Sequence, residues 1–174
     1  MQAQHASNEK EGADVDAMLG LKIIVPDELP SLLSNDYLSE QDLKNPDVRA
    51  NVKAVEEVFA YCTFVATDDD SNLIGYWRGP ENLPLDQAPI VQFDTEGQFA
   101  LLDGKHLTEV VAAQVAFDDH KQFSELKAAF EKMGIVFSGD RYDALASPKG
   151  TFRESPSAMH QRLYEKYLAE ETKK

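Results

Sequence analysis

The chain has 174 residues, of which 43% are hydrophobic and 28% charged, and both shares are ordinary for a globular protein, so general disorder is excluded. Its 17 basic and 31 acidic side chains give a formal net charge of −14, which disfavours direct binding to nucleic acid or an anionic membrane surface and would attract a basic partner. Solubility alone is the simplest reason for such acidity.

The N-terminal segment predicts a tail rather than a targeting signal. Residues 1–16 are polar, lack aromatic side chains and show no periodicity, so we expect a flexible tail followed by a single domain over residues 17–174. The tail has neither the basic nor the apolar region of a secretory signal, and no apolar run approaches the ~20 residues of a membrane-spanning helix. We therefore expect a cytoplasmic location.

Short elements are expected before the first long helix. Residues 23–25 are Ile, Ile and Val, and this run suits a short strand that stops at Pro26. The stretch 27–38 has the composition of a turn with a brief helical piece. Ser39 and Asp42 stand in capping-box positions, with Asp in place of the usual Glu, and predict a small helix.

The first long helix is expected from about Asn45 to Ala60. Asn45 can cap the helix, Pro46 suits its first position, and Asp47 complements the helix dipole. Apolar residues follow at spacings of four, three and four and form one stripe that should face the core: Val48, Val52, Val55 and Phe59.

Four short strands are expected between residues 61 and 102. The runs YCTFVAT and LIGYWR flank the turn DDDSN, and PIVQF and QFALL flank DTEG, where Gly97 can supply a positive φ. The proline-rich GPENLPLDQAP between the two pairs reads as an ordered loop. Hairpin order predicts an α+β fold, with an antiparallel sheet of about four to six strands covered by helices.

The C-terminal half is predicted to be mainly helical. One helix begins near Gly104, a second spans about Asp119–Met133 with Gly134 as the residue after its end, and a third starts at Ser155-Pro156. Residues 135–137 could return as a strand, and 138–155 form a long loop or contain a weak helix. The apolar residues expected to face inward from the three helices are Leu107, Val110, Val111, Val115, Phe123, Leu126, Phe130, Met133, Met159, Leu163, Tyr167 and Leu168.

No motif in the sequence has the residue spacing of a metal, phosphate or cofactor site. Asp68, Asp70 and Asn72 imitate the first ligands of a calcium loop, but the required Gly and Glu positions hold Leu73 and Gly79. The pair at residues 104–105, Gly and Lys, lacks the spacing and the following Ser or Thr of a phosphate loop. We expect no metal and no cofactor.

Catalytic residues are likewise not indicated. No two of the histidines (His5, His106, His120 and His160) have the i, i+4 spacing of a helical metal site. Cys62 sits in an apolar strand, where a buried free thiol is the default. The carboxylate pairs Asp94/Glu96 and Asp118/Asp119 lie in turn-like, solvated segments. An enzyme whose pocket joins Cys62 or two carboxylates to a distant histidine stays as the alternative.

The acidic turns and two aromatic residues form the candidate partner surface. Tyr76 and Trp77 are adjacent in a strand and face opposite sides, so one should enter the core while the other lies on the outer face, as an interface anchor or under a helix. The residues expected to bind a partner are Asp68, Asp69, Asp70, Tyr76, Trp77, Glu81, Asp86, Asp94 and Glu96.

The sequence FVATDDDSNLIGYW, then APIVQFDTEG, then HLTEVVA resembles the SUKH superfamily over roughly residues 60–115. Its strand-turn-helix pattern is matched by Pro89, Val91, Phe93, Asp94, Glu96, Gly97 and Leu107. That family includes bacterial immunity proteins and SMI/KNR-type regulators of cell-wall assembly. The resemblance implies a non-catalytic immunity protein, or antitoxin, that neutralises a toxin such as a basic nuclease domain through an acidic surface. A scaffold subunit of a larger complex is the other binding alternative.

Overall fold

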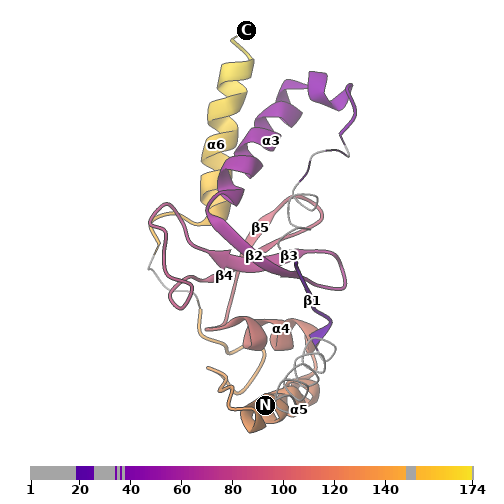
Figure 1. Ribbon diagram of the computed structural model, residues 1–174, viewed down its shortest axis with the longest axis vertical. Coiled ribbons are helices and arrows are strands. Elements are labelled where there is room, and N and C mark those ends of the chain that lie inside the picture. The colour runs from indigo at the N-terminus through magenta and orange to yellow at the C-terminus, as the bar shows by residue number, and fades with distance from the viewer. Residues whose placement is uncertain (1–18, 26–33, 35, 37, 148–151, 174) are drawn as a thin grey trace, which may run out of the picture.

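The computed structural model describes residues 19–25, 34, 36, 38–147 and 152–173 (Figure 1). The predicted tail and most of the turn predicted at 27–38 lie outside these residues. Five strands form one sheet in the order β1-β2-β3-β4-β5, and every neighbouring pair is antiparallel. The strands are β1 (Lys22–Ile23), β2 (Cys62–Thr67), β3 (Leu73–Trp77), β4 (Ile90–Phe93) and β5 (Phe99–Leu102).

Helices cover both faces of this sheet, so the α+β prediction is confirmed. In Figure 1 the sheet separates one pair of helices from the other. The elements are the 3₁₀ helix η1 (Asp42–Lys44) and the helices α3 (Pro46–Phe59), α4 (Leu107–Val115), α5 (His120–Lys132) and α6 (Pro156–Glu171). The helices α3 and α6 pack against each other on one face, and α4 and α5 lie on the opposite face.

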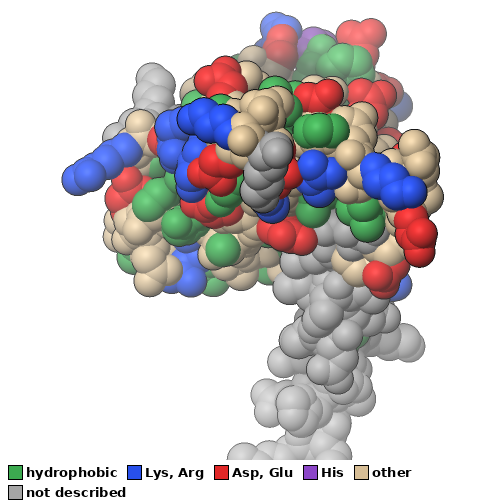
Figure 2. Space-filling model, turned by 90° about the horizontal axis from the view of Figure 1, so that it is seen from above, with side chains coloured by type: hydrophobic (Ala, Val, Ile, Leu, Met, Phe, Trp, Pro, Cys, Tyr) green, Lys and Arg blue, Asp and Glu red, His purple; other side chains and the backbone are tan. Residues whose placement is uncertain are grey.

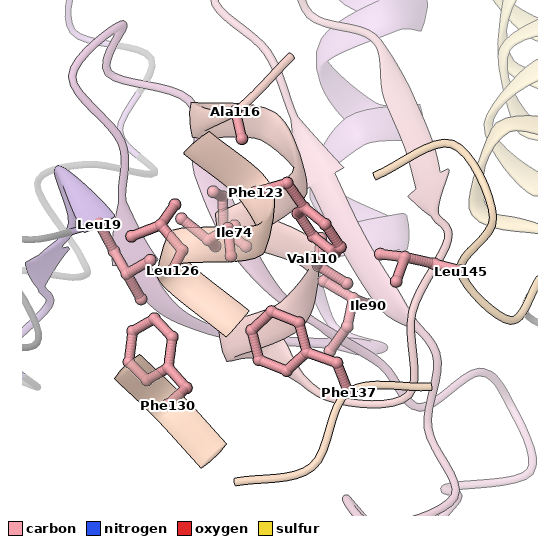
Figure 3. Packing of buried hydrophobic residues seen from close by; sticks show 12 residues of the cluster. Leu19, Ile74, Ile90, Val110, Ala116, Phe123, Leu126, Phe130, Phe137 and Leu145 are labelled. Atoms are coloured by element: carbon pink, nitrogen blue, oxygen red, sulfur yellow. The ribbon is translucent and has the colours of Figure 1, made fainter. Parts of the chain in front are cut away.

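The sheet divides the buried apolar residues into two clusters. Because successive strand residues point to opposite faces, Leu73 and Trp77 join the cluster under α3 and α6, whereas Ile74 joins the cluster under α4 and α5. Figure 3 shows this second cluster, in which Ile74 lies near Phe123 and Ile90 lies near Phe137. The sheet is therefore buried on both faces.

The capping predictions at the helix starts are confirmed. The Asn45 side chain accepts a hydrogen bond from the Asp47 amide at 3.0 Å, and that of Ser155 accepts from Ala158 at 3.2 Å. Before η1, the Ser39 amide donates to Asp42 Oδ2 at 2.9 Å, and the Asp42 amide donates to Ser39 Oγ at 3.1 Å. This reciprocal pair is a capping box.

The apolar stripe predicted for the first long helix is wrong in detail. The fully buried residues of α3 are Ala50, Ala54 and Val58, whereas the predicted stripe of Val48, Val52, Val55 and Phe59 is only partly buried. The reason is that α3 is covered mainly by α6, and small alanines allow the two helix backbones to come close.

The strand predicted at residues 135–137 is also wrong. The chain leaves α5 through Gly134, whose φ is 85°, and the Ile135 amide donates to the Phe130 carbonyl at 3.0 Å. After that, side chains rather than a neighbouring strand satisfy the backbone: Nε2 of His106 lies 3.0 Å from the Val136 carbonyl oxygen. Residues 138–147 follow as a loop without helix or strand, which was one of the two predicted forms.

Across the described ranges, we find no helix that combines the length and the apolar character required to cross a bilayer.

Candidate functional site

Two acidic hairpin turns lie side by side at one end of the sheet. The strands β2 and β4 both end there, and Thr67, Leu73, Phe93 and Phe99 form one row across the four paired strands. The two turns touch, because the Thr95 amide donates to Asn72 Oδ1 at 3.3 Å. We call residues 68–72 and 94–98 together the acidic turn end.

The turn between β2 and β3 is organised by its first aspartate. Asp68 Oδ1 accepts hydrogen bonds from the amides of Asp70 at 3.0 Å and Asn72 at 2.8 Å, and Oδ2 accepts from Asn72 Nδ2 at 2.9 Å. Ser71 completes the turn with a φ of 65°. The Asp68 carboxylate is thus committed to the fold, while Asp69 and Asp70 are exposed.

The turn between β4 and β5 repeats the same arrangement. Asp94 Oδ1 accepts from the amides of Glu96 at 3.0 Å and Gln98 at 2.8 Å, and Gly97 adopts a φ of 83°. The exposed Glu96 accepts from Gln98 Nε2 at 3.2 Å. Among the ion pairs of the described residues, none involves Asp69, Asp70, Asp94 or Glu96. No described lysine or arginine therefore lies within 4.0 Å of these four carboxylates, although Lys22 of β1 pairs with the neighbouring Thr67.

A hollow opens on each side of the acidic turn end. On the α4 side, a hollow of about 250 Å³ lies between the β2–β3 turn, Gln92, Gln114 and Val115. On the α3 side, a hollow of about 410 Å³ lies between the β4–β5 turn, Leu73, Phe93 and Asn51. The two hollows differ in character, because glutamine amides line the first and an aromatic ring lines the second.

Glu81 and Asp86 lie at the opposite end of the sheet. Both belong to the loop between β3 and β4, which connects the far ends of these strands. Glu81 Oε1 lies 3.7 Å from Arg153 Nε, so part of its charge is already compensated. The predicted acidic surface is therefore divided between two ends of the molecule.

The aromatic pair is divided between the two sheet faces as predicted, but Trp77 is not on the surface. Its side chain is 0% exposed under α3 and α6, and its Nε1 donates to the Glu154 carbonyl at 3.2 Å. This burial removes Trp77 from the candidate partner surface. Tyr76 lies on the α4 and α5 side, where it is half-buried, and burial raises the pKa of its hydroxyl.

Charge of both signs covers the end of the molecule where α3 and α6 project beyond the sheet (Figures 1 and 2). In Figure 2, basic and acidic side chains alternate over this end. Arg49 and Lys53 bind the Glu171 carboxylate at 2.8 and 2.6 Å. The acidic turn end is a different kind of surface, because its carboxylates are not interleaved with bases.

The geometry around Cys62 does not favour a nucleophile. Burial raises the pKa of the Cys62 thiol to about 12, and its Sγ lies 3.6 Å from the Val58 carbonyl. The described residues lining the hollow beside Cys62 include no histidine. No group of three or more His, Cys, Asp or Glu side chains within the described ranges is placed to hold a metal ion.

Sequence reasoning missed the residues that shape the two hollows. Gln92 is the clearest case, because it stands in the apolar strand IVQF and faces the α4 side together with Ile90. Its Nε2 lies 3.5 Å from Asp68 Oδ2, and its Oε1 accepts from Gln114 Nε2 at 3.3 Å. A polar residue at an inward-facing strand position was the signal. Asn51 offers no such signal, because it is exposed on a helix.

Comparison with known proteins gives no match: no family model, curated protein or solved structure matches this chain. The resemblance to the SUKH superfamily therefore stays a prediction from its motifs, and the functional argument rests on the geometry of the acidic turn end.

Proposed function

We propose that this protein is a non-catalytic binding domain whose acidic turn end recognises a basic segment of a partner protein. The observation that carries the proposal is that the carboxylates of two adjoining turns have two different roles, one structural and one exposed to solvent. Asp68 and Asp94 hold the turns in shape, while Asp69, Asp70 and Glu96 are exposed to solvent. Clustered carboxylates without interleaved bases attract a basic partner and speed its association.

The turns are well suited to recognition because they are held in place before binding. Each is fixed by two amide hydrogen bonds to one aspartate oxygen, and the Thr95–Asn72 bond links the two turns. A preorganised surface loses less conformational entropy on association than a mobile one. The acidic turn end can therefore present its charges in a defined spacing.

The specific form of the proposal is an immunity protein that neutralises a basic toxin domain, such as a nuclease. Its support is the SUKH-like pattern of residues 89–97 together with the acidity of the turns that this pattern builds. A nuclease groove is basic because it binds phosphates, so an acidic surface can occupy it and exclude the substrate.

The test begins with a partner captured from native extract on the immobilised chain and identified by mass spectrometry. Its association rate is then measured by stopped flow at low and high salt. The variant Asp69→Lys/Asp70→Lys should lower the rate at low salt at least about 10-fold, and the difference should shrink at high salt. The matched control is Asp86→Lys/Asp103→Lys, which makes the same charge change at exposed positions of the opposite end.

Equal rates for the two double variants would reject the acidic turn end as the binding surface. For the immunity protein, the captured partner should arrest growth when expressed alone, and co-expression of this chain should restore growth. A partner that does not arrest growth by itself would reject the immunity-protein proposal and leave the proposal of a domain that binds a basic partner.

A further inference from the structure

The hollow on the α3 side of the acidic turn end combines an apolar floor with an acidic rim. It has a volume of about 410 Å³, and Leu73 and Phe93 lie at its apolar part, Asp94 and Glu96 at its acidic part. We propose that it accepts one arginine side chain of the basic partner. This inference rests on the proposed function, because it names the chemistry that the acidic turn end recognises.

The floor of the hollow is a ring held in a fixed position. The Phe93 ring packs edge-on against Phe59, with centroids 4.8 Å apart and planes at 84°, and lies 4.7 Å from the ring of Phe99. These contacts orient Phe93 while it stays only partly buried. An arginine side chain can lay its methylene stem and guanidinium plane on such an apolar, aromatic surface.

The rim offers carboxylate oxygens to a donor. Asp94 takes up its two turn hydrogen bonds through Oδ1, so Oδ2 faces no described donor, and Glu96 is exposed. The residues that line the hollow include no lysine or arginine. A guanidinium with five N–H donors in a rigid fork can bind two oxygens at once, whereas an ammonium acts as a strongly hydrated point charge.

The far wall of the hollow adds a neutral polar group. Asn51 Oδ1 lies 3.0 Å from Nε2 of His160, and burial lowers the pKa of this histidine. At neutral pH the wall therefore carries no positive charge that would repel a guanidinium. The aromatic floor disfavours a hydrated metal ion in the same place, because such ions prefer a shell of oxygen ligands.

The test is a titration of the full chain with acetylated, amidated Gly-Arg-Gly, followed by the backbone amide signals in NMR spectra. The peptides Gly-Lys-Gly and Gly-citrulline-Gly are the matched probes, because citrulline keeps the shape of arginine without its charge. We expect saturable shifts at Thr95, Glu96 and Gly97 with the arginine peptide. Binding should be at least about 3-fold weaker with lysine and not saturable with citrulline.

Two variants localise the binding. Phe93→Leu and Glu96→Gln should each weaken the arginine peptide about 2- to 5-fold. Glu96 is exposed and does not depend on the core, so its variant stays informative even if Phe93→Leu loosens the fold. The control Glu125→Gln removes an exposed carboxylate of α5, on the other face of the sheet, and should leave the affinity unchanged.

Shifts at Asp69 and Asp70 without shifts at residues 95–97, or equal binding of the citrulline peptide, would overturn the arginine site. If the captured partner still depends on Asp69 and Asp70 for its association, the proposed function stands and only the arginine site fails. If the partner ignores both turns while the arginine peptide fills the hollow, the site stands as a ligand site and the proposed function fails.

Discussion

Glu109 is the buried charge on which the α4 side of the fold depends. Its side chain is 0% exposed and accepts hydrogen bonds from the Lys105 amide, from Ser138 Oγ at 3.1 Å and from the Ser138 amide at 2.5 Å. It thereby joins the segment before α4 to the loop after α5. It also places a negative charge in the first turn of α4, where the helix dipole favours it.

The substitution Glu109→Gln keeps the size of the side chain and replaces one accepting oxygen with an NH₂ group. Oε1 and Oε2 both accept from described donors, so in either orientation the amide faces an N–H or O–H with another donor. One unsatisfied buried pair costs about 1–3 kcal/mol. Loss of the charge near the helix start adds about 0.3–1 kcal/mol. At about 2–4 °C per kcal/mol for a chain of this length, Tm should fall by roughly 3–15 °C.

Urea unfolding followed by far-UV circular dichroism measures the change in free energy, and a thermal melt followed by the same signal measures the change in Tm. The control is Glu125→Gln on α5, where the side chain is 67% exposed and forms a surface pair with Lys121, and its stability should stay within about 0.5 kcal/mol of the parent. A Glu109→Gln variant with the same midpoint and the same m value as the control would refute the reasoning, because the hydrogen bonds of the carboxylate would then contribute nothing net.

Three further predictions concern single residues. Gly75→Ala should lower the free energy of unfolding by about 3 kcal/mol or more, because the added Cβ would lie 2.2 Å from the Thr63 carbonyl oxygen. In Gly97→Ala the added Cβ meets nothing within 4 Å, so this control should lose only the roughly 1 kcal/mol that a positive φ costs. Equal urea midpoints for the two variants would contradict this. Burial lowers the pKa of His160 from 6.5, so as pH falls the unfolded chain binds a proton at this residue before the folded chain does. The stability that the neutral imidazole contributes is therefore fully present above pH 6.5 and is lost below it. The fall in Tm between pH 7.5 and 5 should be smaller in His160→Gln than in the parent. With its pKa raised from 9.0 to about 12, Cys62 should be ionised to thiolate roughly 1,000-fold less at pH 8 than an ordinary thiol. It should therefore react slowly with a disulfide reagent until urea unfolds the chain. Fast labelling of the folded protein would contradict this.

Local signals in the sequence predicted the elements well because their causes are local. Asn45 and Pro46 start a helix through their own side chains, and Gly97 permits a hairpin through its own φ. The adjacency of Tyr76 and Trp77 in one strand likewise placed them on opposite sides of the sheet.

What could not be predicted depends on which elements meet in space. The α3 stripe was misjudged because the sequence does not state that α6 will cover the helix along its length. A strand at residues 135–137 fits β propensity, but the residues before it are committed to the end of α5, and Glu109 binds the Ser138 amide just after it.

The candidate surface was chosen by charge rather than by position in the sheet. The turns that carry Asp69 and Glu96 share an end of the sheet because an antiparallel meander brings alternate connections together, whereas Glu81 and Asp86 belong to the connection between them. The hairpin order predicted from the sequence already implies this division, but a choice by charge alone treats every carboxylate as equivalent. The burial of Trp77 depends on α3 and α6 covering its face of the sheet, which its own segment does not show.

Because of the position of Trp77, the intrinsic fluorescence of the protein reports on one half of the molecule. It is the single tryptophan of the chain and lies wholly inside the cluster under α3 and α6, at the end of β3 away from the acidic turns. Its emission should therefore report the separation of α6 from the sheet and remain silent when a partner occupies the turns. Tryptophan fluorescence alone would not detect partner binding at the acidic turn end or unfolding confined to α4 and α5. Each of these two events requires a spectroscopic label placed in that part of the molecule.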